Sequence, residues 1–206
     1  MNKILISIKP QWCQKIFNGE KTIEVRRTRP KLEPPFEVFV YQTKIRFKVR
    51  AWQENFQSMV FTPNGGAENG NGKVIGSFVC EKVYKIVPDG EYYSNGYDID
   101  DDMLSETCLG RGYLTGYGLG YTLYGWHITA PTLFDKPKEL SEFCVPCKEY
   151  DSDKPHCGEC AYYSYSPNDC GDAQEECLCG GSKPLRRPPQ SWCRVEDKKE
   201  VGKYGA

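Results

Sequence analysis

Five charged residues near the start of the chain have the types and spacing of a site for an anion or a base. Lys9, Lys21, Glu24, Arg26 and Arg27 fall within one predicted strand–helix–strand unit, and Glu24 and Arg26 alternate onto the same strand face. A carboxylate beside two cations stays ionised and can orient an Arg or Lys side chain toward a phosphate or a base edge. The simpler alternative is an exposed strip of ion pairs, which contributes little to stability.

A second cluster of reactive side chains lies in the last third of the chain, where eight of the eleven cysteines fall between Cys144 and Cys193. The order is C-V-P-C, nine residues, C-G-E-C, nine residues, one cysteine, six residues and C-L-C. A C-x-x-C pair presents two thiolates to one ion, and zinc prefers four ligands in a tetrahedron. We therefore predict a structural zinc site held by Cys147, Cys157, Cys160 and Cys179, with Cys144, Cys170 or Cys177 as alternatives for the fourth ligand.

Other roles stay open for these thiols. An iron–sulfur cluster would use the same ligands, while free buried cysteines or disulfides formed on purification would need no metal. A catalytic zinc is disfavoured, because it keeps an open position and usually recruits His or a carboxylate. The segment has few aliphatic residues, so a metal would replace the core that it lacks.

Two tryptophans lie next to residues that could help them bind a base. Trp126 precedes His127 near a predicted strand end, and Trp192 follows Arg187 by five positions. A tryptophan near an arginine can stack on an unpaired base while the arginine holds a phosphate. We expect Trp126 to be a packing residue, whereas Arg187 and Trp192 are candidates for a nucleic-acid contact.

The elements that must position these residues are mostly short strands. A helix begins at Pro10, which the first helical turn tolerates, and ends at Gly19. The hydrophobic pattern predicts strands at 3–8, 21–27, 36–43 and 73–87, the last of them long or bulged.

Turn-rich and glycine-rich segments separate these strands. Residues 62–73 predict a loop, and the acidic residues 98–106 contain a short helix. The Tyr- and Gly-rich residues 112–125 predict a bulged strand that ends near Ile128. The fold class is therefore α+β, with a small, mostly antiparallel β-barrel and flanking helices.

The changes in composition divide the chain into three parts. We expect the barrel to span residues 1–143, a cysteine-rich, zinc-stapled element packed on the barrel to span 144–193, and a polar tail to span 194–206.

The overall composition excludes several classes of protein. Hydrophobic residues make up 39% and aromatic residues 13% of the 206, enough for a folded core, so the chain is not disordered. No apolar run approaches the roughly 18 residues that cross a bilayer, and the first residues lack a secretory pattern. We therefore expect a cytoplasmic protein, without membrane contact, in a reducing compartment where clustered cysteines bind metals.

The charge is unevenly divided along the chain. Residues 1–50 hold twelve Lys/Arg and four Asp/Glu, a balance of +8, against −9 for the remaining residues. This division favours an anionic partner at the N-terminal segment, although charges scattered over a solvated surface would give the same count.

The string ILISIKPQWCQKIFNGEKTIEVRR at 4–27 resembles the start of an ASCH domain, a member of the PUA-like superfamily. The hallmark G-x-K-x-x-E-x-R is present as Gly19, Lys21, Glu24 and Arg26. Three further strings, YGWHI at 124–128, DKPKELSEF at 135–143 and RPPQSWC at 187–193, also resemble ASCH proteins common in bacteriophage and prophage genomes. The resemblance implies a PUA-like barrel with a cleft for RNA or a nucleotide.

The same resemblance implies a catalytic alternative, because some relatives are acetylcytidine amidohydrolases that use a Lys, a Thr and a Glu. In their pattern the Thr lies three residues after the Lys, a position that Glu24 holds here, and Thr22 lies elsewhere on the strand. A carboxylate cannot replace a hydroxyl nucleophile without a change of mechanism. Binding is therefore predicted before catalysis, and Lys21 and Glu24 are the acid–base candidates if the protein is an enzyme.

We therefore predict a module that binds RNA or a modified nucleotide, with the contacts Lys9, Lys21, Glu24, Arg26, Arg27, Arg187 and Trp192. The alternatives are a hydrolase that acts on a modified nucleoside or on RNA, and a zinc-held protein-interaction module of a phage.

Overall fold

The computed structural model of the chain describes residues 1–44, 59–61, 67–69, 72–90, 96–146, 163–167, 173–177 and 182–197. Two compact units emerge: the first comprises 1–138 with 188–193, and the second comprises 139–187 with 194–206. Within the described ranges, no helix is long and apolar enough to span a bilayer.

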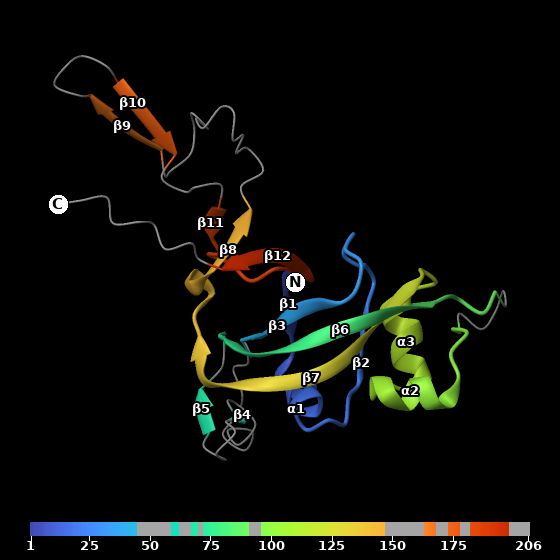
Figure 1. Cartoon of the computed structure of the whole chain (residues 1–206). Helices are drawn as coiled ribbons and strands as arrows, with labels where there is room; N and C mark the ends of the chain where they lie inside the picture. Colours follow the sequence, from blue (N-terminus) through green and yellow to red (C-terminus); the bar gives the residue numbers. More distant parts are fainter. Residues whose placement is uncertain are drawn as a thin grey trace. The chain divides into compact units, whose positions relative to one another are not determined.

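The first unit is built on one mixed sheet (Figure 1). Its strands are β1 (Asn2–Ile8), β3 (Phe36–Gln42), β6 (Val74–Ile86), β7 (Leu123–Lys138) and β2 (Ile23–Arg26), in this spatial order. β1 and β3 run parallel, and the other neighbours run antiparallel. Residues 188–193 lie beside β1, where the Ser7 amide donates to the Ser191 carbonyl. A short hairpin of β4 (Met59–Phe61) and β5 (Ala67–Asn69) belongs to the same unit.

Three helices accompany this sheet. α1 (Pro10–Phe17) begins at a proline and packs against β3 and β7. α2 (Asp101–Thr107) begins where the Asp100 carboxylate accepts a hydrogen bond from the Met103 amide, a standard helix N-cap. α2 packs against β2, and α3 (Arg111–Gly118) lies next to it in Figure 1.

The core of the first unit consists of two buried clusters. One joins β1, α1 and β3 to the fully buried Trp126 of β7, with Ile4 and Ile6 among its members. The other packs Ile23 and Val25 of β2 against Leu114 of α3. The alternation of β2 therefore buries its two aliphatic side chains on one face and leaves Glu24 and Arg26 on the opposite face.

The second unit contains the remaining strands. β8 (Phe143–Pro146) follows the short 3-10 helix η2 (Leu140–Glu142) and pairs with β11 (Ser182–Pro184). It also pairs with the end of β12 (Trp192–Asp197). β9 (Tyr163–Pro167) and β10 (Ala173–Cys177) form an antiparallel pair.

The structure confirms the α+β class and most of the predicted elements. The strands predicted at 3–8, 21–27, 36–43 and 73–87 correspond to β1, β2, β3 and β6, and β6 has three register shifts against β7. The helix that starts at Pro10 and the short helix within 98–106 are present as α1 and α2.

Four expectations were wrong. The sheet is open and mixed, with β2 at its edge, and does not close into a barrel. Residues 112–125 hold α3, because Leu114 is needed in the second core cluster. β7 continues ten residues beyond Ile128 to Lys138. Residues 67–69 of the predicted loop 62–73 form β5, whereas 62–66 and 70–71 lie outside the described residues.

Candidate functional site

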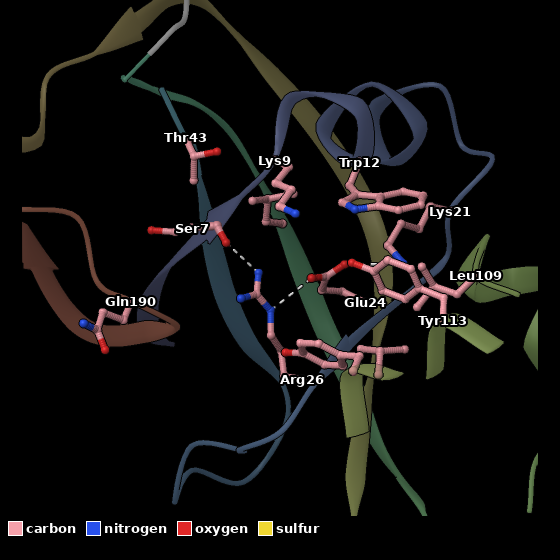
Figure 2. A pocket seen from close by; sticks show the side chains of 13 residues that line it. Ser7, Lys9, Trp12, Lys21, Glu24, Arg26, Thr43, Leu109, Tyr113 and Gln190 are labelled. Atoms are coloured by element: carbon pink, nitrogen blue, oxygen red, sulfur yellow. Dashed lines mark hydrogen bonds and ion pairs between the residues drawn. The ribbon is translucent and has the colours of Figure 1, made fainter. Parts of the chain in front are cut away.

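A pocket of about 340 Å³ opens in the first unit where the end of β1 meets α1, β2 and α3 (Figure 2). This volume lies at the lower end of the range for small-molecule sites. The lining residues are Ser7, Ile8, Lys9, Trp12, Lys21, Glu24, Val25, Arg26, Thr43, Leu109, Tyr113, Tyr117 and Gln190. Charged groups form one part of this wall, and aromatic rings form another.

Lys21 is the most deeply buried cation of the pocket, with 1% of its surface exposed. Its Nζ donates to the Ile23 carbonyl at 2.8 Å and to the Thr107 carbonyl at 2.5 Å, and lies 3.4 Å from Glu24 Oε2. Thr107 ends α2, so Lys21 satisfies a carbonyl that has no partner within the helix. Burial lowers the pKa of Lys21, and the Glu24 carboxylate offsets part of this effect.

Glu24 and Arg26 form the charged floor of the pocket. Arg26 Nε lies 3.0 Å from Glu24 Oε1, an ion pair whose geometry falls short of a hydrogen bond. Arg26 Nη2 donates to the Ser7 carbonyl at 2.7 Å, and Figure 2 shows the guanidinium between Ser7 and Glu24. Both carboxylate oxygens of Glu24 thus face a cation, and the buried group is held in one orientation.

The backbone between α1 and β2 places these three charges together. Gly19 has a φ of +76°, a left-handed conformation that glycine adopts without strain, and it follows the end of α1. The chain then reverses into β2, where the two-residue repeat puts Glu24 and Arg26 on the pocket face.

Aromatic side chains of α1 and α3 form the opposite wall. Trp12 and Tyr113 meet edge to face with ring centroids 6.2 Å apart, and Tyr113 and Tyr117 lie nearly parallel at 6.3 Å. The Trp12 ring also lies 5.5 Å from Lys21 Nζ. Burial raises the pKa of Tyr117 above its ordinary value.

Two cations beside the pocket differ from Lys21 and Arg26 in being exposed. Lys9 lines the rim, and Arg27 lies over the ring of Tyr117 with its guanidinium carbon 5.0 Å from the ring centroid. Among the residues that the structure describes, neither Lys9 nor Arg27 has an acidic partner. Their charges are therefore available to an anionic ligand.

The structure brings together four of the seven predicted contacts. Lys9, Lys21, Glu24 and Arg26 all line the pocket. Arg27 lies beside it, on the outer face of Tyr117.

The other two predicted contacts lie elsewhere. Trp192 packs against Trp126 at 6.5 Å between ring centroids, and its Nε1–H donates to the Thr28 hydroxyl. Arg187 is exposed and is assigned to the second unit.

Three ring-bearing lining residues were missed by the sequence analysis: Trp12, Tyr113 and Tyr117. Tyr113 and Tyr117 are four residues apart, which is the spacing of neighbours on one helix face. That signal was present, but the surrounding glycines favoured a strand.

The predicted zinc ligands can be placed only in part. Cys147, Cys157, Cys160, Cys170 and Cys179 lie outside the described residues, and Cys177 lies in β10. Cys144 is buried in β8 and is a free thiol. Within the described ranges there is no group of three or more potential ligands in reach of one ion.

Comparisons with known proteins give a distant likeness. No model of a known protein family matches the sequence, and no curated protein matches it. Among solved structures, the chain is similar to ASCH from Zymomonas mobilis, with 16% identity, a TM-score of 0.43, and coverage of 68% of this chain and 74% of that chain. Two point mutants of that protein match with TM-scores of 0.43 and 0.44, again at 16% identity, and 77% and 75% of their chains are covered. A likeness at this TM-score does not indicate function, so we infer the function of this protein from the geometry of the pocket.

Proposed function

We propose that this protein binds RNA or a modified nucleotide by holding one base in the pocket between the aromatic wall and the Glu24–Arg26 floor. The observation that supports it is the combination of flat ring surfaces with a buried, oriented carboxylate and guanidinium in one small cavity. A nucleobase presents the same combination, because it has two flat faces and an edge of hydrogen-bond donors and acceptors.

The aromatic wall suits a planar ligand. Trp12 and Tyr113 come from different helices and meet at the pocket, and Figure 2 shows both on the side that faces Glu24. Stacking on such rings contributes about 1–3 kcal/mol per base and tolerates any base, because each has a π face.

The floor suits a base edge better than a phosphate. Glu24 retains lone pairs that can accept from a ring or amino N–H. Arg26 retains N–H groups beyond those that face Ser7 and Glu24. A phosphate at the floor would meet the Glu24 carboxylate, so we assign phosphate contact to the exposed Lys9 at the rim.

Calorimetric titration with the four nucleosides, their 5′-monophosphates and a short single-stranded RNA tests this function. We expect Tyr113→Leu to weaken nucleoside binding about tenfold, because it removes one stacking surface. Tyr113 is 46% exposed, so its loss should leave the fold intact. The matched control is Tyr121→Leu, since Tyr121 is 70% exposed and does not line the pocket. Equal affinities in both variants, or no binding of any probe, would reject the assignment.

A salt series adds a second test. Lys9→Gln should weaken binding of the 5′-monophosphates and RNA but not of nucleosides, and should reduce the salt slope for RNA by about one. A slope equal to that of the unchanged protein would remove Lys9 from the site.

A hydrolase acting on a modified nucleoside or on RNA is the second candidate. It is favoured by the position of Lys21 next to Glu24 and by the burial that lowers the pKa of Lys21, because a lower pKa makes the neutral, basic form of the amine more accessible. Within the described residues, however, no hydroxyl of the lining donates to Lys21 or Glu24, and Nζ already faces three acceptors. Incubation with acetylcytidine and RNA decides it: product formed by the unchanged protein and absent with Glu24→Gln would favour catalysis.

We also propose that a zinc ion staples the cysteine-rich segment, with Cys147, Cys157, Cys160 and Cys179 or one of the alternatives Cys144, Cys170 and Cys177 as ligands. The free, buried thiol of Cys144 is compatible with a reducing cytoplasm and with this role. Native mass spectrometry should show bound zinc that is lost in the double variant Cys157→Ser, Cys160→Ser. A metal-free protein, or one carrying iron and sulfide, would overturn the zinc assignment.

A further inference from the structure

We propose that a second nucleotide stacks on Arg27, directly outside the pocket, so that the preferred ligand is a single-stranded RNA chain and not a free nucleoside. The inference rests on the proposed function, because it assigns a neighbour to the base in the pocket. It concerns a side chain that does not line the pocket at all.

A continuous run of ring contacts leads from the pocket to Arg27. Trp12 meets Tyr113 at 6.2 Å, Tyr113 lies nearly parallel to Tyr117 at 6.3 Å, and the Arg27 guanidinium lies 5.0 Å from the Tyr117 centroid. The first three side chains line the pocket, and the fourth is exposed. The series of ring contacts that begins in the pocket therefore continues beyond the cavity to Arg27.

Arg27 is held in place before any ligand arrives. Its Nε donates to the Tyr117 carbonyl at 2.7 Å, and its Nη2 donates to the same oxygen. Together with the contact to the Tyr117 ring, these bonds fix the plane of the guanidinium. An ordered side chain loses less conformational entropy when a ligand binds than a mobile surface arginine does.

The remaining contact groups of Arg27 match a nucleotide. Its guanidinium carbon lies over the Tyr117 ring, 5.0 Å from the centroid, and an arginine plane can also stack on a base. Two of its five N–H groups are used, so the others can donate to a phosphate. No acidic side chain among the described residues pairs with it, whereas Arg29 lies 3.8 Å from Glu33.

The geometry of the pocket limits where the backbone of a bound RNA chain can run. Because Glu24 repels a phosphate at the floor, the chain that continues from a bound base must pass the rim. On the α3 side of that rim, Arg27 supplies an unpaired cation next to a stacking surface. A dinucleotide can therefore place one base in the pocket, its linking phosphate at Arg27 and its second base on the guanidinium, while Lys9 remains the contact for a 5′-phosphate.

Titration of the four nucleosides and of the dinucleotides ApA, CpC, GpG and UpU tests the second subsite. For the base that binds, we expect the dinucleotide to bind at least about tenfold more tightly than the nucleoside. Arg27→Gln should lower the ratio of dinucleotide to nucleoside affinity by about tenfold. Arg27→Lys keeps the charge but lacks the planar guanidinium, and it should also lower this ratio. The matched control is Arg29→Gln, which removes the same charge two residues away and should leave the ratio unchanged.

The outcomes separate the two proposals. If a nucleoside binds and its dinucleotide binds no more tightly, or if Arg27→Gln changes the ratio no more than Arg29→Gln, the second subsite is wrong and the base pocket stands. If Arg27→Lys keeps the full ratio, the stacking role is wrong. If no nucleoside and no dinucleotide binds, the proposed function fails and the subsite fails with it.

Discussion

Lys21 is a positioning residue in this pocket. Its ammonium group faces the Ile23 carbonyl, the Thr107 carbonyl and the Glu24 carboxylate, so its three N–H groups already have acceptors. It therefore connects the end of α2 to β2 and orients Glu24. The groups that remain open to a ligand are the free lone pairs of Glu24 and the free N–H groups of Arg26.

Glu24→Gln is expected to destabilise the protein by about 3 kcal/mol, the cost of breaking a buried ion pair by removing one partner. Glutamine keeps the shape of the side chain, but Lys21 and Arg26 would then be two buried cations without a counter-charge. Urea unfolding at neutral pH measures this change.

The matched control for this substitution is Glu20→Gln, which removes an equivalent carboxylate from an exposed pair. Glu20 Oε2 accepts from Lys15 Nζ at 2.8 Å, but both side chains are well exposed. Solvent screens such a pair, so its loss should leave the unfolding midpoint unchanged. Equal effects of the two substitutions would contradict the burial of the Glu24 charge.

The lowered pKa of Lys21 predicts a pH dependence of stability. Between its pKa in the folded protein and its ordinary value near 10.5, the unfolded chain binds one more proton than the folded chain. Stability contributed by Lys21 therefore rises with pH through this window and is lost as pH falls through the lower, folded-state value.

Comparison with Lys21→Met isolates this effect. Unfolding free energies of both proteins should be measured from pH 7 to pH 10.5. Cys13 and the tyrosines titrate in both proteins, so their contributions cancel in the difference. We expect the difference in unfolding free energy between the unchanged protein and the variant to move in favour of the unchanged protein as pH rises. A difference that is constant with pH would show that Lys21 keeps its ordinary pKa.

Sequence reasoning found the charged half of this site and missed the aromatic half, for a physical reason. Glu24 and Arg26 are brought together by the two-residue repeat of one strand, which is a local property. Tyr113 reaches Trp12 only through the packing of α3 on β2, across about a hundred residues of chain. No local pattern encodes such a contact.

At the scale of elements, α3 shows how tertiary packing overrides local preference. Its sequence, RGYLTGYG, contains three glycines and two tyrosines, which all disfavour a helix relative to alanine or leucine. As a helix, the segment nevertheless places Leu114 in the buried cluster of Ile23 and Val25. The burial of one leucine and the two tyrosine contacts therefore decide the conformation.

The glycines of α3 give a paired prediction. An added Cβ at Gly116 meets no atom within 4 Å, so Gly116→Ala should stabilise the protein by about 0.5–1 kcal/mol through helix propensity. An added Cβ at Gly118 would collide with the phenol of Tyr97, which is buried and donates to the Tyr121 carbonyl at 2.9 Å.

Gly118→Ala should therefore destabilise the protein although it makes the same chemical change. Thermal unfolding of the two variants, with circular dichroism as the probe of helix content, measures the opposite signs. If both substitutions stabilise, Tyr97 does not pack against the end of α3.

At the scale of the whole molecule, the first unit is discontinuous in sequence. Residues 188–193 belong to it although they lie along the chain between the two parts of the second unit, 139–187 and 194–206. The predicted boundaries follow changes of composition and have the barrel domain spanning 1–143. Composition does not reveal that residues 188–193 return to the first unit. Their contacts with it include hydrogen bonds to the Ser191 and Pro189 carbonyls and the packing of Trp192 on Trp126.

We expect removal of residues 188–193 to lower the protection of nearby backbone amides from hydrogen exchange. In a chain that ends at Arg187, the Ser7 amide loses the Ser191 carbonyl and the Ser7 hydroxyl loses the Pro189 carbonyl. Trp126 loses the Trp192 ring and keeps that of Phe36. Amide hydrogen exchange at Ser7 should therefore accelerate, while Val38 and Val40 in the centre of the sheet stay protected. The full chain with Trp192→Phe is the control, because it keeps the backbone bonds and a ring at this position. Unchanged exchange at Ser7 in the shortened chain would show that β1 does not depend on the return, and the first unit would then end with β7.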